Sequence, residues 1–378
     1  MKLKIFSDQG YLPEGSSPTL MLEPFWLEQT EEDRPPWEKR LANYAKISHS
    51  LFEMSSLEEA DIAVLPFDWV DVTGHSWKDK INKSALDLGI QFAQRVKQAG
   101  KPIAIFYSGD ISHQKIPIED AFVFRFCLIG SQRQPKDFIF TILYEDLVQY
   151  YLANKLPIRQ KQEKPVVGFD GYATQSSLSR KLKELIRQGA MLASGGSSYK
   201  IHEGYNLRYK ALKYLNDSPL VDPNFKIRDN MVFYGDTNDS EKKLKLRLEY
   251  VQNMVESDYI LCCRGWGNSS LRVFETFCFG RIPIFVDTDC VLSYDFKIDW
   301  KKYCVWLDEK DLPQIAERVA EFHNNLSNQE FVELQYKCRE LWQEWLSYEG
   351  FFSNFWRHFP KKSSQEEFVD TFHEIPLL

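Results

Sequence analysis

The chain of 378 residues has no long apolar run, and nowhere do its hydrophobic residues approach the roughly 18 in succession that cross a bilayer. Its opening segment, MKLKIFSDQG, has the pattern of a strand and lacks the longer apolar core of a secretion signal. These absences argue against a transmembrane segment. They predict a cytoplasmic location, with any membrane contact confined to the periphery.

A basic block is also missing. The formal net charge is −7, from 47 Lys and Arg against 54 Asp and Glu, and the positive residues are spread along the chain. Proteins that bind nucleic acid gather Lys and Arg on one face or in one segment. We therefore expect no nucleic acid as a main partner.

Cysteine is scarce and shows no metal-binding spacing. The seven cysteines are odd in number, lie mostly inside apolar runs, and form neither a CxxC pair nor a Cys/His pattern suited to zinc. A disulfide framework is unusual in a chain of this size with strand-embedded cysteines. We expect reduced core thiols and no bound metal ion.

What the sequence does contain is an alternation of short β-rich runs and helical patterns, typical of parallel sheets built from βαβ units. The strand-like runs of the first half are KLKIFS, ADIAVLPF, PIAIFYSG and AFVFRF. Between the second and third, the apolar residues of segment 77–100 recur every three or four positions, and Gly100 follows as a helix C-cap. This pattern predicts one βαβ crossover.

A polar, proline-flanked segment at 153–165 reads as a linker, and the alternation restarts after it. The predicted strands there are PVVGFDG, NMVFYG, DYILCC, IPIFV and YCVWLD, and the predicted helices are SSLSRKLKELIRQG, SEKKLKLRLEYVQNMVES and LPQIAERVAEFHNNL. We expect an α/β chain of two facing Rossmann-like domains with parallel sheets, at 1–155 and 156–335. An aromatic-rich helical tail at 336–378 should close the fold by packing across both domains.

One stretch, LCCRGWGNSSLRVFETFCFGRIPIFV, packs a strand, a glycine-containing loop and a helix into one short segment. Tyr259–Cys263 reads as a buried strand, and a helix should begin near Ser270 with Asn268 or Ser269 as its N-cap. Glycines allow a ligand to approach the backbone, and free amides at a helix N-terminus attract phosphate. The loop matches neither the P-loop nor the GxGxxG pattern.

Asn268, Arg272 and Glu275 fall on one face of that helix. The arginine would bind phosphate beside the helix N-terminus, and the carboxylate one turn further on would accept hydrogen bonds from a ribose diol. Arg272 and Glu275 would also suit a surface ion pair of about 0.2–0.5 kcal/mol. Spacing alone leaves both interpretations open.

The segment 257–313 resembles the C-terminal signature of the exostosin family of glycosyltransferases, family 47. The residues that carry its pattern of Arg-Gly followed by Ser-x-Arg-x-x-Glu are Arg264, Gly265, Ser270, Arg272 and Glu275. Weaker similarity extends upstream through SLEEADIAVLPFDW, FYSGDIS and the GFDG turn with Arg180 beyond it. The chain departs from the family at Cys263, where members commonly have proline, and we expect it to lack the N-terminal membrane anchor that eukaryotic members carry.

The resemblance implies a GT-B fold in which the C-terminal domain holds a sugar nucleotide and the N-terminal domain holds the acceptor. It also implies sugar transfer with inversion and without a required divalent metal. Carried over by position, the donor-binding residues would be Arg264, Ser269, Ser270 and Arg272 on the diphosphate, Glu275 on the ribose, and Arg180 as a second phosphate contact.

We therefore expect a bacterial-type glycosyltransferase that moves a sugar from a nucleoside diphosphate donor, UDP-linked as first choice, to a saccharide acceptor in surface polysaccharide synthesis. Two alternatives stay open. One is a sugar-nucleotide hydrolase or epimerase on the same fold, and the other is a degenerate protein that binds glycans or partners without catalysis.

An inverting transfer needs a base for the acceptor hydroxyl. Ligands of open α/β sheets bind at the carboxyl ends of strands, where the first half offers Asp8, Asp68, and Asp110 with His113. Asp110 is our first choice as catalytic base and Asp8 the second.

Two further polar motifs are left outside the site. The acidic pair in DTD, Asp287 and Asp289, could hold a metal ion, but we interpret it as a loop at a strand end near the donor sugar. His202 and Glu203 suggest a second acid/base pair, but we interpret His202 as an exposed loop histidine.

Overall fold

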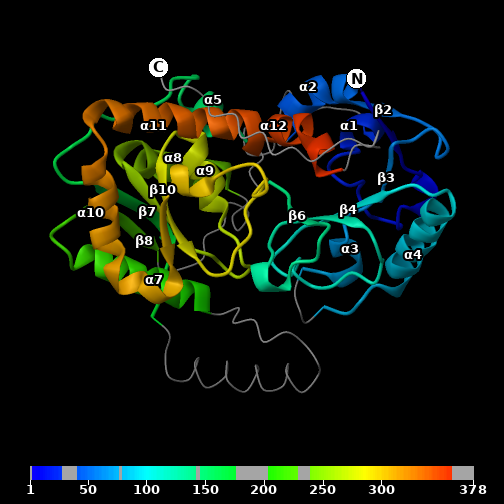
Figure 1. The fold of residues 1–378 in the computed structure, drawn as a ribbon, viewed down its shortest axis with the longest axis horizontal. Helices are drawn as coiled ribbons and strands as arrows, with labels where there is room; N and C mark the ends of the chain where they lie inside the picture. The colour runs from blue at the N-terminus through cyan, green and yellow to red at the C-terminus, as the bar shows by residue number, and fades with distance from the viewer. Residues whose placement is uncertain are drawn as a thin grey trace, which may run out of the picture.

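The computed structural model describes residues 2–27, 41–75, 79–141, 145–175, 203–228 and 239–359. Within them, two parallel sheets lie side by side, each flanked by helices (Figure 1). The first has six strands in the order β2-β1-β3-β4-β5-β6, and the second has five in the order β11-β10-β9-β7-β8. The predicted two-part α/β architecture is confirmed.

The first sheet contains the four strands that the sequence predicted and two that it did not. Its strands are β1 (Leu3–Phe6), β2 (Phe52–Met54), β3 (Ile62–Val64), β4 (Ile103–Tyr107), β5 (Phe122–Arg125) and β6 (Asp137–Ile139). The unpredicted strands β2 and β6 lie at the two edges of the sheet and have only three residues each. Such short strands contain too few residues to show a periodicity.

The helices of this half are α1 (Glu23–Trp26), α2 (Ala42–Leu51), α3 (Val70–Thr73), α4 (Lys83–Gln98) and α5 (Leu147–Tyr151). Helix α4 is the predicted crossover between β3 and β4. Asn82 caps it by accepting a hydrogen bond from the Ala85 amide at 3.3 Å, and Phe92 and Val96 are among the side chains that it buries. Gly100, at φ +66°, follows the helix in the left-handed conformation that glycine tolerates best.

The second sheet consists of β7 (Val166–Tyr172), β8 (Asp222–Arg228), β9 (Tyr259–Cys262), β10 (Ile282–Asp287) and β11 (Val305–Asp308). Its helices are α7 (Glu203–Asn216), α8 (Ser240–Glu256), α9 (Leu271–Cys278) and α10 (Ile315–Asn325). The sequence did not predict α7 or β8, and β8 is a largely exposed edge strand without an apolar run. The predicted helix at 176–189 and the predicted strand at 230–235 lie outside the described residues.

A chain of helices returns from the second sheet to the first, along the top of Figure 1: α11 (Asn328–Leu341), η6 (Trp342–Leu346), α12 (Tyr348–Ser353) and η7 (Phe355–His358). Helix α12 packs on α2, where the rings of Tyr44 and Phe352 stack with centroids 4.2 Å apart. Phe355 also packs on Phe124 of β5, with ring centroids 4.8 Å apart. The aromatic tail thus completes the core of the N-terminal half.

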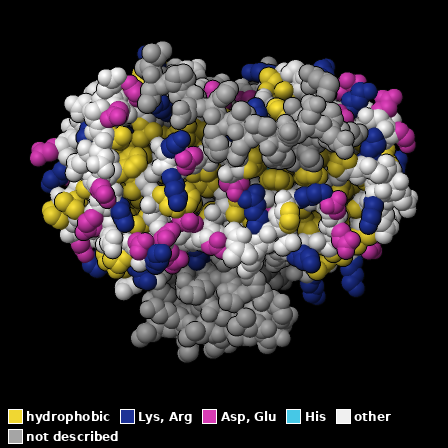
Figure 2. All heavy atoms as spheres, viewed as in Figure 1, with side chains coloured by type: hydrophobic (Ala, Val, Ile, Leu, Met, Phe, Trp, Pro, Cys, Tyr) yellow, Lys and Arg dark blue, Asp and Glu magenta, His cyan; other side chains and the backbone are white. Residues whose placement is uncertain are grey.

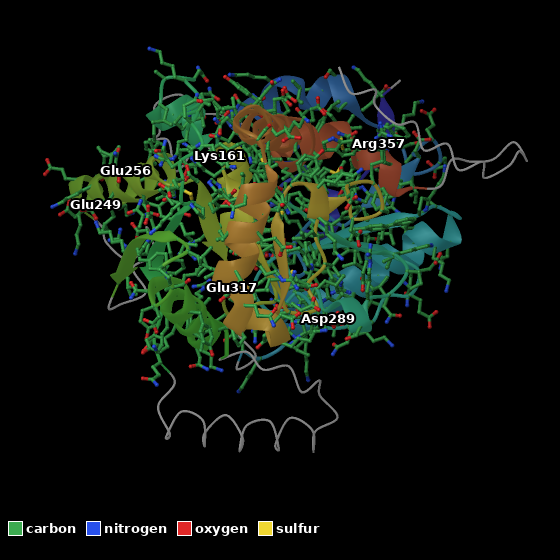
Figure 3. All side chains as sticks on the ribbon, turned by 60° about the vertical axis from the view of Figure 1, so that its left-hand side comes forward. Lys161, Glu249, Glu256, Asp289, Glu317 and Arg357 are labelled. Atoms are coloured by element: carbon green, nitrogen blue, oxygen red, sulfur yellow. The ribbon has the colours of Figure 1, made fainter. Side chains whose placement is uncertain are left out.

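Residues 152–165 run without helix or strand between α5 and β7. They are fastened to the C-terminal helices, because the Arg159 amide donates to Gln335 Oε1 of α11 at 2.9 Å and Lys161 Nζ donates to the Leu326 carbonyl at the end of α10 at 2.5 Å. Lys161 is labelled in Figure 3. The division of the chain at 155 and 335 stays a prediction.

Acidic and basic side chains are interspersed over the face seen in Figure 2. No helix in the described part of the chain combines the length and apolar character needed to cross a bilayer. All seven cysteines are free thiols, and six of them are buried.

Candidate functional site

The strand–loop–helix unit predicted from the sequence is formed by β9 and α9. The helix begins at Leu271 with Ser270 as its N-cap, one or two residues later than predicted. Ser270 is only 7% exposed, yet its hydroxyl makes no hydrogen bond within the described residues. The N-terminal amides of α9 therefore lack the side-chain cap that Ser usually supplies, and a buried hydroxyl beside them has unused bonding capacity.

Asn268 is not the N-cap because its side chain is used elsewhere. It is fully buried, and its amide nitrogen lies 3.1 Å from the Leu128 carbonyl, 3.1 Å from that of Thr288 and 2.9 Å from that of Asp289. Leu128 follows β5 of the first sheet, whereas Thr288 follows β10 of the second. Asn268 thus ties the β9–α9 loop to both halves of the molecule.

Arg272 lies in the first turn of α9 and reaches back over β7. Its Nη2 donates to the Asp170 carbonyl at 2.6 Å, and its guanidinium carbon lies 4.4 Å from the centroid of the Phe169 ring. A Cβ atom on Gly171, which has φ +155°, would come within 2.2 Å of Arg272 Nη2. The GFDG segment, predicted as a turn, lies inside strand β7, where it positions this arginine, and only glycine at position 171 leaves the guanidinium room.

A second arginine, Arg208 of α7, stands close enough to Arg272 for their charges to interact. Sequence reasoning missed it, since α7 was not predicted and one arginine in a charged helix gives no signal. Its Nη2 donates to the Cys263 carbonyl at 3.3 Å. Burial, and then the neighbouring charge of Arg272, lowers the pKa of Arg208 to about 10.

The guanidinium groups of Arg208 and Arg272 have unused hydrogen-bonding capacity in the described part of the chain. Within the described residues, Arg208 and Arg272 form no salt bridge, and the Nε atoms of both are buried without a hydrogen-bond acceptor. Two adjacent cations with unused donors, beside an uncapped helix N-terminus, form a site with the charge and geometry for an anion.

The remaining predicted phosphate ligands lie on the same loop, with one exception. Arg264 is 5% exposed, and the half-buried Ser269 accepts a hydrogen bond at its carbonyl from the Gly265 amide at 3.2 Å. The loop packs tightly on α7, because a Cβ on Gly204 would lie 2.1 Å from the Gly265 carbonyl oxygen. Arg180 lies outside the described residues.

Glu275, one turn into α9, is 4% exposed and belongs to a buried polar network. The Tyr250 hydroxyl donates to its carboxylate, and Arg247 Nη1 lies 3.8 Å from its Oε1. Arg247 also pairs with the buried Glu145. The surface ion pair between Arg272 and Glu275 that the spacing allowed does not form, and the ribose role of Glu275 stays a prediction.

Asp110 follows β4 in the first half and contacts the β9–α9 loop of the second. Its Oδ1 accepts a hydrogen bond from the Gly267 amide at 3.1 Å. Desolvation raises the pKa of this carboxyl, opposed first by that hydrogen bond and then by the charges of Arg208 and His75. The adjacent His113 is kept neutral at physiological pH because burial lowers its pKa to about 4.

The other two candidate aspartates make different contacts. Asp8 caps the short helix η1 (Gln9–Tyr11) by accepting from the Gly10 amide at 2.9 Å, and it forms a 2.6 Å ion pair with Arg95 of α4. Asp68 is half-buried and accepts from the amides of Val70 and Ser108, each at 2.9 Å. Of the three, Asp110 is the one that contacts the β9–α9 loop.

The acidic pair of the DTD motif makes loop contacts. Asp287 Oδ1 accepts from the Cys290 amide at 3.0 Å, and Asp289 Oδ2 accepts from the Ser131 hydroxyl at 2.6 Å. Asp289 thus lies at the boundary with the N-terminal half (Figure 3). The described residues contain no group of three or more His, Cys, Asp or Glu side chains placed to hold a metal ion.

Two α/β halves with parallel sheets, joined by returning C-terminal helices, form a GT-B-type architecture. Residues 198–322 match the exostosin GT47 domain, so this part of the chain is similar to the exostosin family of glycosyltransferases. The matched segment includes α7 with Arg208, and the whole of β9 and α9.

Similar proteins carry glycosyltransferase names. The chain is 36% identical over 66 residues to a "Probable glucuronosyltransferase" of Oryza sativa subsp. japonica, covering 18% of this chain and 15% of that protein. The same values of identity and length hold for "Probable beta-1,4-xylosyltransferase IRX10L" of Arabidopsis thaliana, with 18% of this chain and 16% of that protein covered. With "Exostosin-1" of Drosophila melanogaster it shares 28% over 99 residues, which is 26% of this chain and 12% of that protein. The matched segment spans between 12% and 16% of the length of each of these three relatives.

Proposed function

We propose that this chain transfers a sugar, with inversion, from a nucleoside diphosphate sugar to a saccharide acceptor, and that the donor diphosphate binds at the N-terminus of α9. The observation that carries the proposal is that the charges of Arg208 and Arg272 act on each other while neither residue forms a salt bridge within the described residues. Two desolvated like charges destabilise each other unless an anion joins them. A diphosphate offers two adjoining anionic groups with acceptor oxygens for both Nε atoms.

Placing the diphosphate at the N-terminus of α9 also assigns the other contacts to the sugar-nucleotide donor. The Ser270 hydroxyl, which has no partner within the described residues, can donate to a phosphate oxygen, and Ser269 and Arg264 lie on the loop that approaches it. Glu275 would accept from the ribose diol, because a carboxylate has about four lone-pair sites and Tyr250 uses one of them. Arg180 is retained as a further phosphate contact by resemblance.

In the transfer step, the anomeric carbon loses its bond to the diphosphate oxygen while a bond to the acceptor oxygen forms on the opposite face. Arg208, Arg272 and the amides of α9 would stabilise the negative charge that develops on the departing diphosphate. Asp110 would take the proton of the attacking hydroxyl on Oδ2, while Gly267 holds Oδ1. Asp8 is the second choice, since Arg95 of α4 engages its carboxylate.

The finer assignments rest on the resemblance and on the names of relatives. UDP is the first choice of nucleotide, and xylose and glucuronate are the first sugars to test, because relatives carry xylosyl- and glucuronosyltransferase names. No divalent metal is required in this proposal, since two arginines and a helix N-terminus supply the positive charge. Assembly of a surface polysaccharide in a bacterial cytoplasm is the proposed setting.

The test is a thermal-shift screen of UDP-, GDP-, CMP- and TDP-linked sugars, each with and without EDTA. A ligand that binds the folded state raises its unfolding midpoint. We expect one nucleotide family to stabilise the wild type in both conditions, and Arg208→Ala or Arg272→Ala to abolish the shift. Arg318→Ala is the matched control, because Arg318 forms an exposed pair with Glu321 on α10.

Full nucleotide binding by both site variants would overturn the proposed donor site. Product assays then separate the enzymatic alternatives. Release of nucleoside diphosphate without any acceptor would instead indicate a hydrolase, and nucleotide-independent binding of glycans without turnover would indicate a degenerate binding protein.

A further inference from the structure

Three aromatic side chains from separate elements meet beside Asp110. They are Tyr172 at the end of β7, Tyr205 in the first turn of α7, and Trp266 in the β9–α9 loop. The rings of Tyr172 and Tyr205 contact edge to face, with centroids 5.1 Å apart and an interplanar angle of 70°. The Tyr205 hydroxyl lies close enough to the Trp266 side chain to interact with it, and all three residues are half-buried.

This aromatic cluster lies between the proposed base and the proposed diphosphate site. Trp266 immediately precedes Gly267, whose amide binds Asp110 at 3.1 Å. On the other side, the guanidinium carbon of Arg208 lies 5.5 Å from the Tyr205 ring centroid. The charges of both Arg208 and Asp110 act on the Tyr205 hydroxyl, which places that ring within reach of both groups.

We propose that this cluster is the platform on which a pyranose ring of the saccharide acceptor packs, an inference that rests on the proposed function. A sugar ring has a face of C–H groups and a rim of hydroxyls, so it suits aromatic faces whose edges carry O–H and N–H groups. The edge-to-face contact between Tyr172 and Tyr205 and the approach of Tyr205 to Trp266 order the rings before a ligand arrives, which lowers the entropic cost of binding.

The position beside Asp110 favours the acceptor over the nucleobase. The attacking hydroxyl must reach the free oxygen of Asp110, and the ring that carries it must then lie next to that residue. The diphosphate occupies the far side of Arg208 in this arrangement, toward Arg272 and α9. A nucleobase on the cluster would have to lie between its own diphosphate and the catalytic base, where the acceptor has to enter.

The experiment compares wild type with Trp266→Ala, Trp266→Phe and Tyr172→Ala, using Trp356→Ala as a control for loss of an exposed aromatic ring. The readouts are acceptor KM with xylotetraose or cellotetraose at saturating UDP-xylose or UDP-glucuronate, and the Kd of UDP by calorimetry. We expect roughly tenfold higher acceptor KM in Trp266→Ala and Tyr172→Ala, because Trp and Tyr are enriched among the few residues that dominate binding energy. Trp266→Phe should keep most of the acceptor affinity, and UDP affinity should change less than twofold throughout.

A parallel loss of UDP affinity in Trp266→Ala would assign the cluster to the nucleobase and overturn the proposal, as would an unchanged acceptor KM. Direct titration of the tetrasaccharides distinguishes failure of the acceptor platform from failure of the proposed function. If UDP binds neither wild type nor variants while the tetrasaccharides bind wild type more tightly than Trp266→Ala, the platform stands and the transferase assignment fails. If the wild type binds UDP but neither tetrasaccharide, the platform is overturned.

Discussion

The Gly267 amide donates a 3.1 Å hydrogen bond to Asp110 Oδ1, and this bond joins the two halves of the molecule at the proposed reaction centre. A Cβ on Gly267 would lie 2.9 Å from Asp110 Oδ1 and 3.0 Å from its Cα, so the contact requires glycine. The β9–α9 loop of the second half and the proposed base, Asp110, of the first half are therefore held together by Gly267, a residue without a side chain.

Replacement of Asp110 should separate chemistry from donor binding. If Asp110 is the base, Asp110→Asn should lower kcat by about 10²–10⁴, while UDP affinity changes little because the amide oxygen can still accept from Gly267. Stopped assays of sugar transfer and calorimetry with UDP measure the two quantities. A variant that retains wild-type kcat would transfer the role of base to Asp8, which Asp8→Asn then tests.

The pH profile should respond to Arg208. Only ionised Asp110 can act as a base, so activity should fall as pH drops through its pKa, which desolvation holds above the ordinary 3.8. The charge of Arg208 lowers that pKa, so its removal in Arg208→Gln should move the acid limb of kcat to higher pH. The control Arg318→Gln should leave the limb in place. An acid limb that does not move in Arg208→Gln would contradict the electrostatic link.

Gly171→Ala should displace Arg272. The new Cβ would come within 2.2 Å of Arg272 Nη2, so we expect at least tenfold weaker UDP binding as the guanidinium moves. Gly15→Ala is the matched control, because Gly15 also has a positive φ, of +79°, but no atom within 4 Å of an added Cβ. Both variants should lose about 1–3 kcal/mol of stability from backbone strain, and only Gly171→Ala should lose nucleotide affinity. Calorimetry of both variants decides this.

Arg247 should be important for stability. It is buried between the carboxylates of Glu145 and Glu275, and Arg247→Met would leave both of them without their cation. Loss of one partner from a buried ionic network typically costs about 3–5 kcal/mol of unfolding free energy. Urea unfolding measures this, with Arg318→Met as the exposed control that should cost less than about 1 kcal/mol. Equal small losses in both variants would show that the network contributes little.

Asp68 should make stability depend on pH. Burial raises its pKa from 3.8 to about 6, so between those values the folded chain binds more protons than the unfolded one. This group therefore favours folding most at low pH, and its contribution declines as pH rises from about 4 to 6 and is constant above.

Asp68→Asn removes that titration. One pKa unit corresponds to about 1.4 kcal/mol. The stability of the variant minus that of the wild type, measured as free energy of unfolding, should therefore be up to roughly 3 kcal/mol higher at pH 7.5 than at pH 4. Comparing the two pH values cancels the pH-independent cost of the amide, and urea unfolding at each provides the measurement. An identical difference at both values would show that Asp68 titrates normally.

Much of the architecture could be predicted from local sequence. Buried parallel strands such as β4 and β9 are continuous apolar runs, and α4 shows its buried face and C-cap directly in its spacing. The edge strands β2, β6 and β8 were not predicted, because a short or exposed edge strand shows no clear apolar periodicity in its sequence. The N-cap of α9 was misplaced for a related reason, since the role of Asn268 depends on carbonyls contributed by two other loops.

The sequence by itself determined the strand–loop–helix unit of β9 and α9, because short-range glycine, capping and periodicity signals act within one segment. Only the tertiary structure decided which charges meet there. Arg208 and Arg272 are brought together by the packing of α7 on the β9–α9 loop, and Asp110 by the docking of one sheet against the other. Such contacts join residues far apart in the chain, and their electrostatic coupling depends on distance and burial, which no local pattern encodes.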